Sequence, residues 1–446
     1  MTVNTLNLYV SRFVFLQVSS FLMFFGVNLS FLFFAHLIFA FAGSQLQILS
    51  RANTILRKFV LLFAAGAFLS MFYNFWEGDL TAFSASLKVI LNYVYWTIML
   101  MLMTALAPSR ALDLNRLFKM VTIALISVSI YYFIGQRFIA NSLFFKKFGP
   151  NNFSFLLICY VPYLVHFTRR RVHPALALVL LGLLLMGQLA EGRRAGFILI
   201  LAGGMGAYYV HIFKFDTIGK FVRPLILLLL GWSLLQTYFV KDQIRARSSR
   251  IYQLIYSSDN ELANDRSALV RKAMVEKGIL LFEDNIWFGV GLNNFTSIYR
   301  EIDGDFEGSQ FVINKNIYQR ASSHNSYINI LAEGGLVLFI PFMGIMLFLL
   351  LNGLRYFNRM QNSEKVIFIS FVLMSAHLYF YNGIVNSLAW FNIGALAYSI
   401  SAHKYPTRLL MNKIAPVILA GNSTERNFYL GRVSVPHQSR ESTGIR

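Results

Sequence analysis

The chain has few charged residues, few acidic residues and almost no cysteine. Only 13% of its 446 residues are Asp, Glu, Lys or Arg, whereas typical globular domains contain about 25%. This scarcity excludes an ordinary soluble enzyme. Because Cys159 is the single cysteine, no intrachain disulfide can form and a cysteine-based metal site is not expected. We also expect no cleavable signal peptide, because the apolar stretch after Arg12 offers no small-residue cleavage site.

Apolar residues dominate what is present, at 56% of the chain. Since a helix needs about 20 apolar residues to cross a bilayer core of roughly 30 Å, the pattern predicts an all-α polytopic membrane protein with about 12 transmembrane helices. Their centres are expected within residues 13–27, 29–47, 59–75, 87–107, 117–135, 151–167, 174–190, 195–212, 221–240, 326–351, 366–382 and 385–402.

These helices divide the chain into four parts. An N-terminal transmembrane bundle of about nine spans occupies residues 1–240, and about three C-terminal spans occupy residues 326–402. The long loop 241–325 between them has mixed polarity, and residues 403–446 form a basic tail.

The distribution of basic residues orients the spans. The chain carries 40 Lys and Arg against 20 Asp and Glu, and nucleic acid is not the expected partner because the chain lacks a polar surface on which to display them. Short loops such as the one holding Arg51, Arg57 and Lys58 are basic, as cytoplasmic loops are. The loop 241–325 then lies on the outer side. Its 11 Lys and Arg balance its 11 Asp and Glu, so the excess charge lies elsewhere.

Two of the predicted outer loops break this charge rule. Their cations are Arg137, Lys146 and Lys147 in residues 136–150, and Arg193 and Arg194 in residues 191–195. One interpretation is that these side chains bind an anionic group at the outer face. The other is that one span is miscounted and the cations are ordinary cytoplasmic anchors.

A histidine precedes the predicted span 326–351. Ser322 or Ser323 is expected to cap a helix that starts here, and His324 in its first turn would be held near the neutral form that a general base requires. At about 100° per residue, His324 and Gly335 would share one helix face, and Gly335 would let a neighbouring helix approach closely. The alternative is an interfacial histidine satisfied by headgroups or water.

The outer loop contains one predicted amphipathic helix, from Asp265 to Phe282. Arg266 lies in its first turn, where a cation is unfavourable unless an anion shares the site; the alternative is a solvated surface arginine. The glycines in 287–295 lack a Rossmann context, so we expect a tight turn that packs aromatic residues onto the membrane surface. No metal site is expected, and His377 is the clearest ionisable residue within the spans.

Five local patterns, in order along the chain, resemble the O-antigen polymerase and O-antigen ligase superfamily of bacterial inner-membrane glycosyltransferases. The matching segments are Phe148-Gly149-Pro150-Asn151-Asn152, Arg193-Arg194-Ala195-Gly196, Asp265-Arg266, Gly289-Val290-Gly291-Leu292-Asn293-Asn294-Phe295, and His324-Asn325 followed after nine residues by Gly335. The second segment has Arg193 where the family has serine. The last is the most specific match.

The resemblance implies a GT-C-like fold in the bacterial inner membrane, with the loop and the active site facing the periplasm. It implies an inverting, metal-independent transfer of glycan from undecaprenyl diphosphate without a cofactor. Arg194 and Arg266 would hold the diphosphate, and His324 would act on the acceptor hydroxyl. Arg193, Arg137, Lys146, Lys147 and Asn325 would be further substrate-binding residues. The implied partners are the lipid-linked oligosaccharide, an acceptor glycan lipid, membrane lipids and a chain-length regulator.

The superfamily's two branches differ in the acceptor, which is a second lipid-linked repeat unit for a polymerase and lipid A-core for a ligase. The last position of the ligase pattern is Leu338 here instead of Gly, Thr or Tyr, which favours polymerase. A lipid-linked oligosaccharide flippase is a further alternative. Such a transporter should carry paired ionisable groups or broken helices within its spans.

Overall fold

The computed structural model describes residues 54–76, 80–107, 113–126 apart from 117, 120 and 124, 150–171, 194–210, 266–298, 323–384 and 387–404. All of them belong to one compact unit, Met1–Lys404. They form helices, turns and loops without a strand, which confirms the all-helical prediction for this part of the chain. Several predicted spans, including those within 13–47, 174–190 and 221–240, lie outside the described residues, so the total of about 12 spans stays a prediction.

The helices correspond to predicted apolar runs, with one exception. Seven fall on predicted spans: α4 (Thr54–Trp76), α5 (Leu80–Leu106), α8 (Pro150–Arg171), α10 (Arg194–Tyr209), α16 (Ser326–Tyr356), α17 (Asn362–His377) and α18 (Ser387–Lys404). A short 3-10 helix, η3 (Phe357–Arg359), follows α16. The exception is α14 (Arg266–Asp284), which is the helix predicted in the outer loop.

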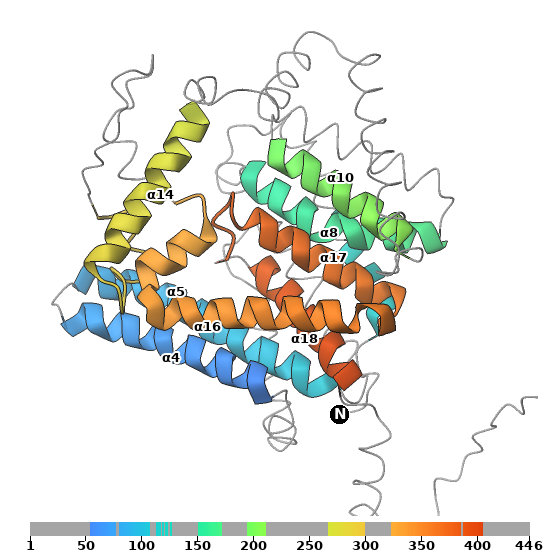
Figure 1. The fold of residues 1–446 in the computed structure, drawn as a ribbon, viewed down its shortest axis with the longest axis horizontal. Helices are drawn as coiled ribbons and strands as arrows, with labels where there is room; N and C mark the ends of the chain where they lie inside the picture. Colours follow the sequence, from blue (N-terminus) through green and yellow to red (C-terminus); the bar gives the residue numbers. More distant parts are fainter. Residues whose placement is uncertain are drawn as a thin grey trace, which may run out of the picture. The chain divides into compact units, whose positions relative to one another are not determined.

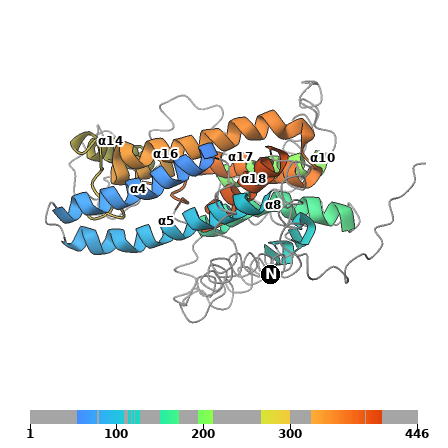
Figure 2. The same cartoon turned by 90° about the horizontal axis from the view of Figure 1, so that it is seen from below.

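Two helical segments in this part of the chain are long and apolar enough to cross a membrane. They are Thr54–Tyr73 in α4 and Ser326–Arg359, which includes α16 and η3. α4, α5 and α16 lie side by side (Figures 1 and 2). Small residues make the contact close: a methyl group at Gly66 would lie 2.5 Å from the carbonyl oxygen of Val337, and one at Gly344 would lie 2.5 Å from the ring of Phe59. These two contacts show that α4 and α16 are antiparallel.

α17 packs against α8 and α10, and both pairs are antiparallel. The Ser370 hydroxyl on α17 donates to the carbonyl of Cys159 on α8, and the rings of Phe155 and His377 stack with centroids 5.9 Å apart. On α10, Gly203 faces Leu373 and Gly206 faces Ile369. The first turns of α8 and α10 therefore lie toward the end of α17.

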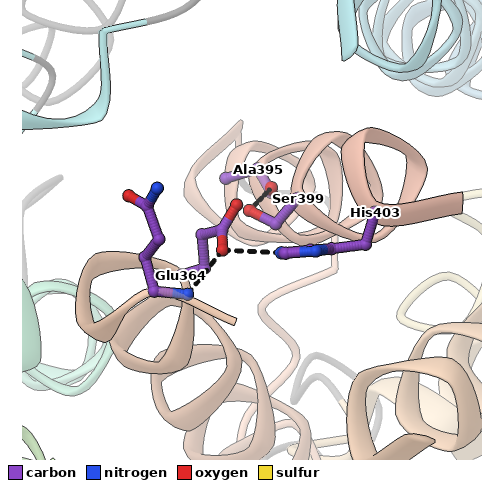
Figure 3. A network of polar contacts seen from close by, with 5 residues as sticks. Glu364, Ala395, Ser399 and His403 are labelled. Carbon is purple, nitrogen blue, oxygen red and sulfur yellow. Dashed lines mark hydrogen bonds and ion pairs between the residues drawn. The ribbon is translucent and has the colours of Figure 1, made fainter. Parts of the chain in front are cut away.

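A polar contact joins α17 to α18 at the other end of the bundle. The Glu364 carboxylate in the first turn of α17 accepts the backbone N–H of Gln361 at 2.7 Å. The same oxygen lies 2.7 Å from the Nε2 of His403, at the end of α18 (Figure 3). This contact ties the start of α17 to the end of α18.

Candidate functional site

His324 lies in a turn directly before α16 instead of in its first helical turn. Asn325 is the N-cap, and its side-chain oxygen accepts the N–H groups of Tyr327 at 2.9 Å and Ile328 at 3.2 Å. His324 adopts a positive φ of 50°, which turns the chain into the cap. The cap predicted at Ser322 or Ser323 is therefore wrong. Asparagine caps as well as serine does, and here the tight turn brings the asparagine into the capping position.

α16 is broken at Gly335, two and a half turns after its start. This residue has φ 60° and ψ −164°, a backbone region that is essentially restricted to glycine. Figure 1 shows the result as a short first segment set at an angle to the long remainder of the helix. The prediction that His324 and Gly335 share one helical face is wrong, because neither residue has helical backbone geometry.

The glycine-rich segment after α14 fills the break. The N–H groups of Val290 and Gly291 donate to the carbonyls of Ala332 at 2.9 Å and Glu333 at 3.0 Å. In return, two N–H groups beyond the break find acceptors in the same segment, Leu336 on the carbonyl of Ile286 at 2.8 Å and Val337 on the carbonyl of Trp287 at 3.1 Å. The backbone groups freed by the break are thus paired with a loop.

Two glycines allow this close approach. A methyl group at Gly289 would lie 2.4 Å from the backbone of Glu333, and one at Gly335 would lie 2.4 Å from the backbone of Trp287. The sequence predicted that a helix would approach Gly335, but the neighbour is the turn predicted in 287–295. That turn is present and exposes Trp287, yet Leu292 is fully buried, so the segment is inserted into the helix bundle as well as facing outward.

Side chains of α4 and α5 hold the inserted segment. The Ser70 hydroxyl lies 2.8 Å from the carbonyl of Phe288 and 3.1 Å from that of Glu333. The Ser86 hydroxyl donates to the carbonyl of Leu292 at 2.9 Å. Ser70 therefore contacts both the inserted segment and the first part of α16, just before the break.

The turn between α17 and α18 holds the start of α16. The N–H of Ser326 donates to the carbonyl of Leu378 at 2.8 Å, and the Ser326 hydroxyl donates to the carbonyl of Tyr381 at 2.8 Å and accepts the N–H of Gly383 at 2.9 Å. Since α17 ends here, the His324 turn lies at the same end of the bundle as the first turns of α8 and α10.

A buried polar chain runs through the site and was missed from the sequence. The Ser323 hydroxyl contacts Oδ1 of Asn329 at 3.2 Å, and Nδ2 of Asn329 donates to Glu333 at 2.9 Å. The other Glu333 oxygen accepts the N–H of Phe295 at 3.2 Å, and the Phe295 carbonyl accepts Nζ of Lys277 at 2.7 Å. The signal was Glu333 itself, an acid within an apolar run.

Lys277 joins this chain from α14. Its side chain is 1% exposed and its ammonium lies 5.0 Å from the centroid of the Phe295 ring. Burial lowers the pKa of Lys277 to about 8, because the apolar surroundings disfavour the charged form. A pairing of α14 with α16 is also visible at Gly278, where a methyl group would lie 2.2 Å from the side chain of Ile328.

The predicted catalytic residues lie at, or directly before, the starts of three helices. Arg194 is the first residue of α10 and Arg266 the first of α14, although their side chains are not among the described ones. His324 is half-buried just before the cap of α16. On α14, Arg271 lies close enough to act electrostatically on His377 at the end of α17. The first turns of α14 therefore face the end of the bundle that carries the His324 turn.

The structure gives little information on the role of the remaining predicted substrate-binding residues. Arg137, Lys146, Lys147 and Arg193 lie outside the described residues. Asn325 is buried, and the structure gives its side-chain oxygen a capping role. Within the described part of the chain, no group of three or more His, Cys, Asp or Glu side chains is arranged to hold a metal ion.

Residues 153–343 match the O-antigen ligase family. The match contains Arg194, Arg266 and His324, together with the glycine-rich segment and the break in α16. It confirms the predicted resemblance to the O-antigen polymerase and ligase superfamily over this region of the chain. No curated protein matches this chain.

Proposed function

We propose that this chain is a polymerase of O-antigen or a related surface polysaccharide, acting at the periplasmic face of the bacterial inner membrane. The single observation that supports this most is the gathering of the starts of α10 and α16, and the early turns of α14, toward one end of the bundle. These elements begin with or follow Arg194, His324 and Arg266, within the region that matches the O-antigen ligase family.

The donor in this proposal is a glycan on undecaprenyl diphosphate. A helix start carries free N–H groups and the positive end of the helix dipole, both of which favour a diphosphate. Arg194 and Arg266 stand at two such starts, and a guanidinium presents a planar pair of donors to phosphate oxygens. The arginines would stabilise the charge that grows on the diphosphate as it leaves. Arg193, Arg137, Lys146 and Lys147 would assist at the headgroup.

His324 is the proposed general base. The acceptor hydroxyl loses its proton to the imidazole and its oxygen bonds to the anomeric carbon, while the bond from that carbon to the diphosphate oxygen breaks. The electron pair of the broken bond stays on undecaprenyl diphosphate. Attack from the face opposite the leaving group inverts the anomeric configuration. The positive φ of His324 sets it outside the helix, so the ring is not confined to one helical face.

The helix directions agree with the predicted membrane topology. In the proposed orientation, α5, α8, α10, α16 and α18 all run from the periplasmic to the cytoplasmic side, and α4 and α17 run back. Antiparallel contacts of α4 with α16, and of α17 with α8 and α10, are what this alternation requires. Single cysteines introduced at Glu191 and Ser309 in a Cys159→Ala background should therefore label from the periplasm. Labelling from the cytoplasm would contradict the proposed orientation.

Ligase activity is the alternative within the superfamily. The departure from the ligase pattern, Leu338, is fully buried, and it packs against Gly334 in the preceding turn. Leu338 therefore affects packing beside the break in α16. The glycan phenotype of a deletion strain is what distinguishes the two acceptors. Deletion of the gene should leave lipid A-core with a single repeat unit if the chain is a polymerase, and with none if it is a ligase.

A lipid-linked oligosaccharide flippase is favoured by one observation, the broken helix α16 with its buried Glu333, because transporters place such breaks at their binding sites. In this chain, however, the freed backbone groups pair with residues 286–291 and so are not open to a substrate. A flippase would show no transfer of glycan between purified lipid-linked substrates.

The direct test is a reconstituted transfer assay with lipid-linked oligosaccharide. His324→Ala and Arg266→Ala should insert normally and lose transfer. Arg359→Ala is the matched control for the arginine, because Arg359 is exposed in η3 after the end of α16, and His403→Ala is the matched control for the histidine because it lies at the opposite end of the bundle. Full activity of either His324→Ala or Arg266→Ala would disprove the assignment.

A further inference from the structure

Glu333 joins two parts of the molecule that carry the proposed catalytic residues. It lies two residues before the break in α16 and is 5% exposed. One carboxylate oxygen accepts the N–H of Phe295 at 3.2 Å, from the loop after α14. The other accepts Nδ2 of Asn329 at 2.9 Å, from the first segment of α16. A single buried side chain thus bridges the loop and the helix.

The contacts continue in both directions to the site. Beyond Asn329, the chain of contacts reaches the hydroxyl of Ser323, the residue that precedes His324. Beyond Phe295, the carbonyl of that residue accepts Nζ of Lys277 on α14, the helix that begins at Arg266. The polar chain therefore runs from the neighbour of the proposed base to the helix of a proposed diphosphate-binding arginine.

We infer that Glu333 is a positioning residue for glycan transfer, which holds the His324 turn and α14 in the one arrangement where both face the same substrate. This inference rests on the proposed function. The requirement for a carboxylate follows from its partners, because Nδ2 of Asn329 and the backbone N–H groups of Phe295 and Asn293 are all donors, and a carboxylate offers two acceptor oxygens. An apolar residue here would remove the acceptor oxygens that these donors use.

This donor and acceptor pattern defines a decisive pair of substitutions. Glu333→Gln keeps the shape of the side chain but replaces one acceptor oxygen with an NH₂ group. That NH₂ group then faces a donor, either Nδ2 of Asn329 or the N–H of Phe295. Asn329→Asp alone places a second carboxylate against Glu333. In the double variant the pattern is whole again: the Gln oxygen accepts the N–H of Phe295, its NH₂ group donates to the new Asp, and the second Asp oxygen accepts the Ser323 hydroxyl.

The experiment measures kcat and the donor KM of the purified full-length chain in lipid nanodiscs, together with its thermal unfolding. Glu333→Gln and Asn329→Asp should each lower kcat by about tenfold or more with little change in donor KM, since misplaced catalytic groups impair the reacting geometry. The Asn329→Asp/Glu333→Gln double variant should recover most of the lost kcat. Glu364→Gln makes the same chemical change at a buried glutamate at the opposite end and should leave kcat unchanged.

Three results would overturn the inference. The first is an unaltered kcat in Glu333→Gln while His324→Ala is inactive. The second is a double variant no more active than either single variant. The third is a loss of kcat in Glu333→Gln that Glu364→Gln reproduces at equal loss of thermal stability. Retained activity in His324→Ala would instead disprove the proposed function, and this inference with it.

Discussion

The carboxylate of Glu364 and the imidazole of His403 lie 2.7 Å apart, and they join the start of α17 to the end of α18 far from the His324 turn. Both side chains are largely buried, with 9% and 13% of their surface exposed. The stability of the bundle at this end can therefore be altered without altering the site, which makes the pair a useful reference for the predictions below.

His403→Ala should lower stability without lowering glycan transfer. Removing the imidazole leaves the Glu364 oxygen with the N–H of Gln361 as a remaining partner, and the loss of one hydrogen bond costs about 0.5–1.5 kcal/mol. The measurement is the unfolding temperature in detergent, alongside kcat in the transfer assay. A drop in kcat at a temperature where the variant is fully folded would mean that this end of the bundle is coupled to the reaction.

Gly335→Ala should destabilise the chain strongly. Its backbone region costs a residue with a side chain about 1–3 kcal/mol, and the added methyl group would lie 2.4 Å from the backbone of Trp287. Gly206→Ala on α10 is the matched control, since its methyl group would meet Ile369 at an ordinary 3.4 Å. Equal unfolding temperatures for the two variants would show that the loop does not fill the break as described.

Substitutions of Asn325 should separate its capping role from substrate binding. Asn325→Ala removes the cap and should cost about 1 kcal/mol, whereas Asn325→Ser keeps a capping oxygen and should retain nearly all the stability. If capping is its sole role, donor KM will be unchanged in the serine variant. A raised KM in the stable serine variant would instead support the predicted contact of Asn325 with substrate.

Stability should depend on the charge of Lys277 in the alkaline range. Because burial lowers its pKa to about 8 and the unfolded value is about 10.4, the unfolded chain binds the extra proton between these values. Stability contributed by Lys277 therefore rises with pH from about 8 to about 10.4, by up to about 3 kcal/mol. Lys277→Met should lack this rise. Parallel pH profiles of unfolding for both proteins would contradict the burial of a charged Lys277.

The helices were largely predictable because each depends on its own residues. Apolar runs located α4, α5, α8, α10, α16, α17 and α18, and the amphipathic pattern located α14 to within a few residues. His324, Arg194 and Arg266 could be proposed as site residues because their residue types stand out beside apolar segments, and their roles stay predictions. Local composition is enough for such features.

The break in α16 could not be predicted because it depends on residues about 50 positions away. An apolar run that contains Gly334 and Gly335 is compatible with a continuous helix, and only the pairing of Leu336 and Val337 with Ile286 and Trp287 makes the break stable. Glu333 was missed for a related reason. One acid among many apolar residues barely changes the average hydropathy, and one of its partners, the N–H of Phe295, comes from another segment.

The contact of Ser70 with Glu333 has a consequence for synthesis in the cell. The two residues are 263 positions apart in the chain, and a ribosome adds about 5–20 residues per second. α4 is therefore made roughly 13–50 s before the segment that it helps to hold in place. Until then the Ser70 hydroxyl must find other partners in the membrane, and a chain truncated before α16 lacks the residues that complete the site. The proposed glycan transfer can therefore begin only after most of the protein has been translated.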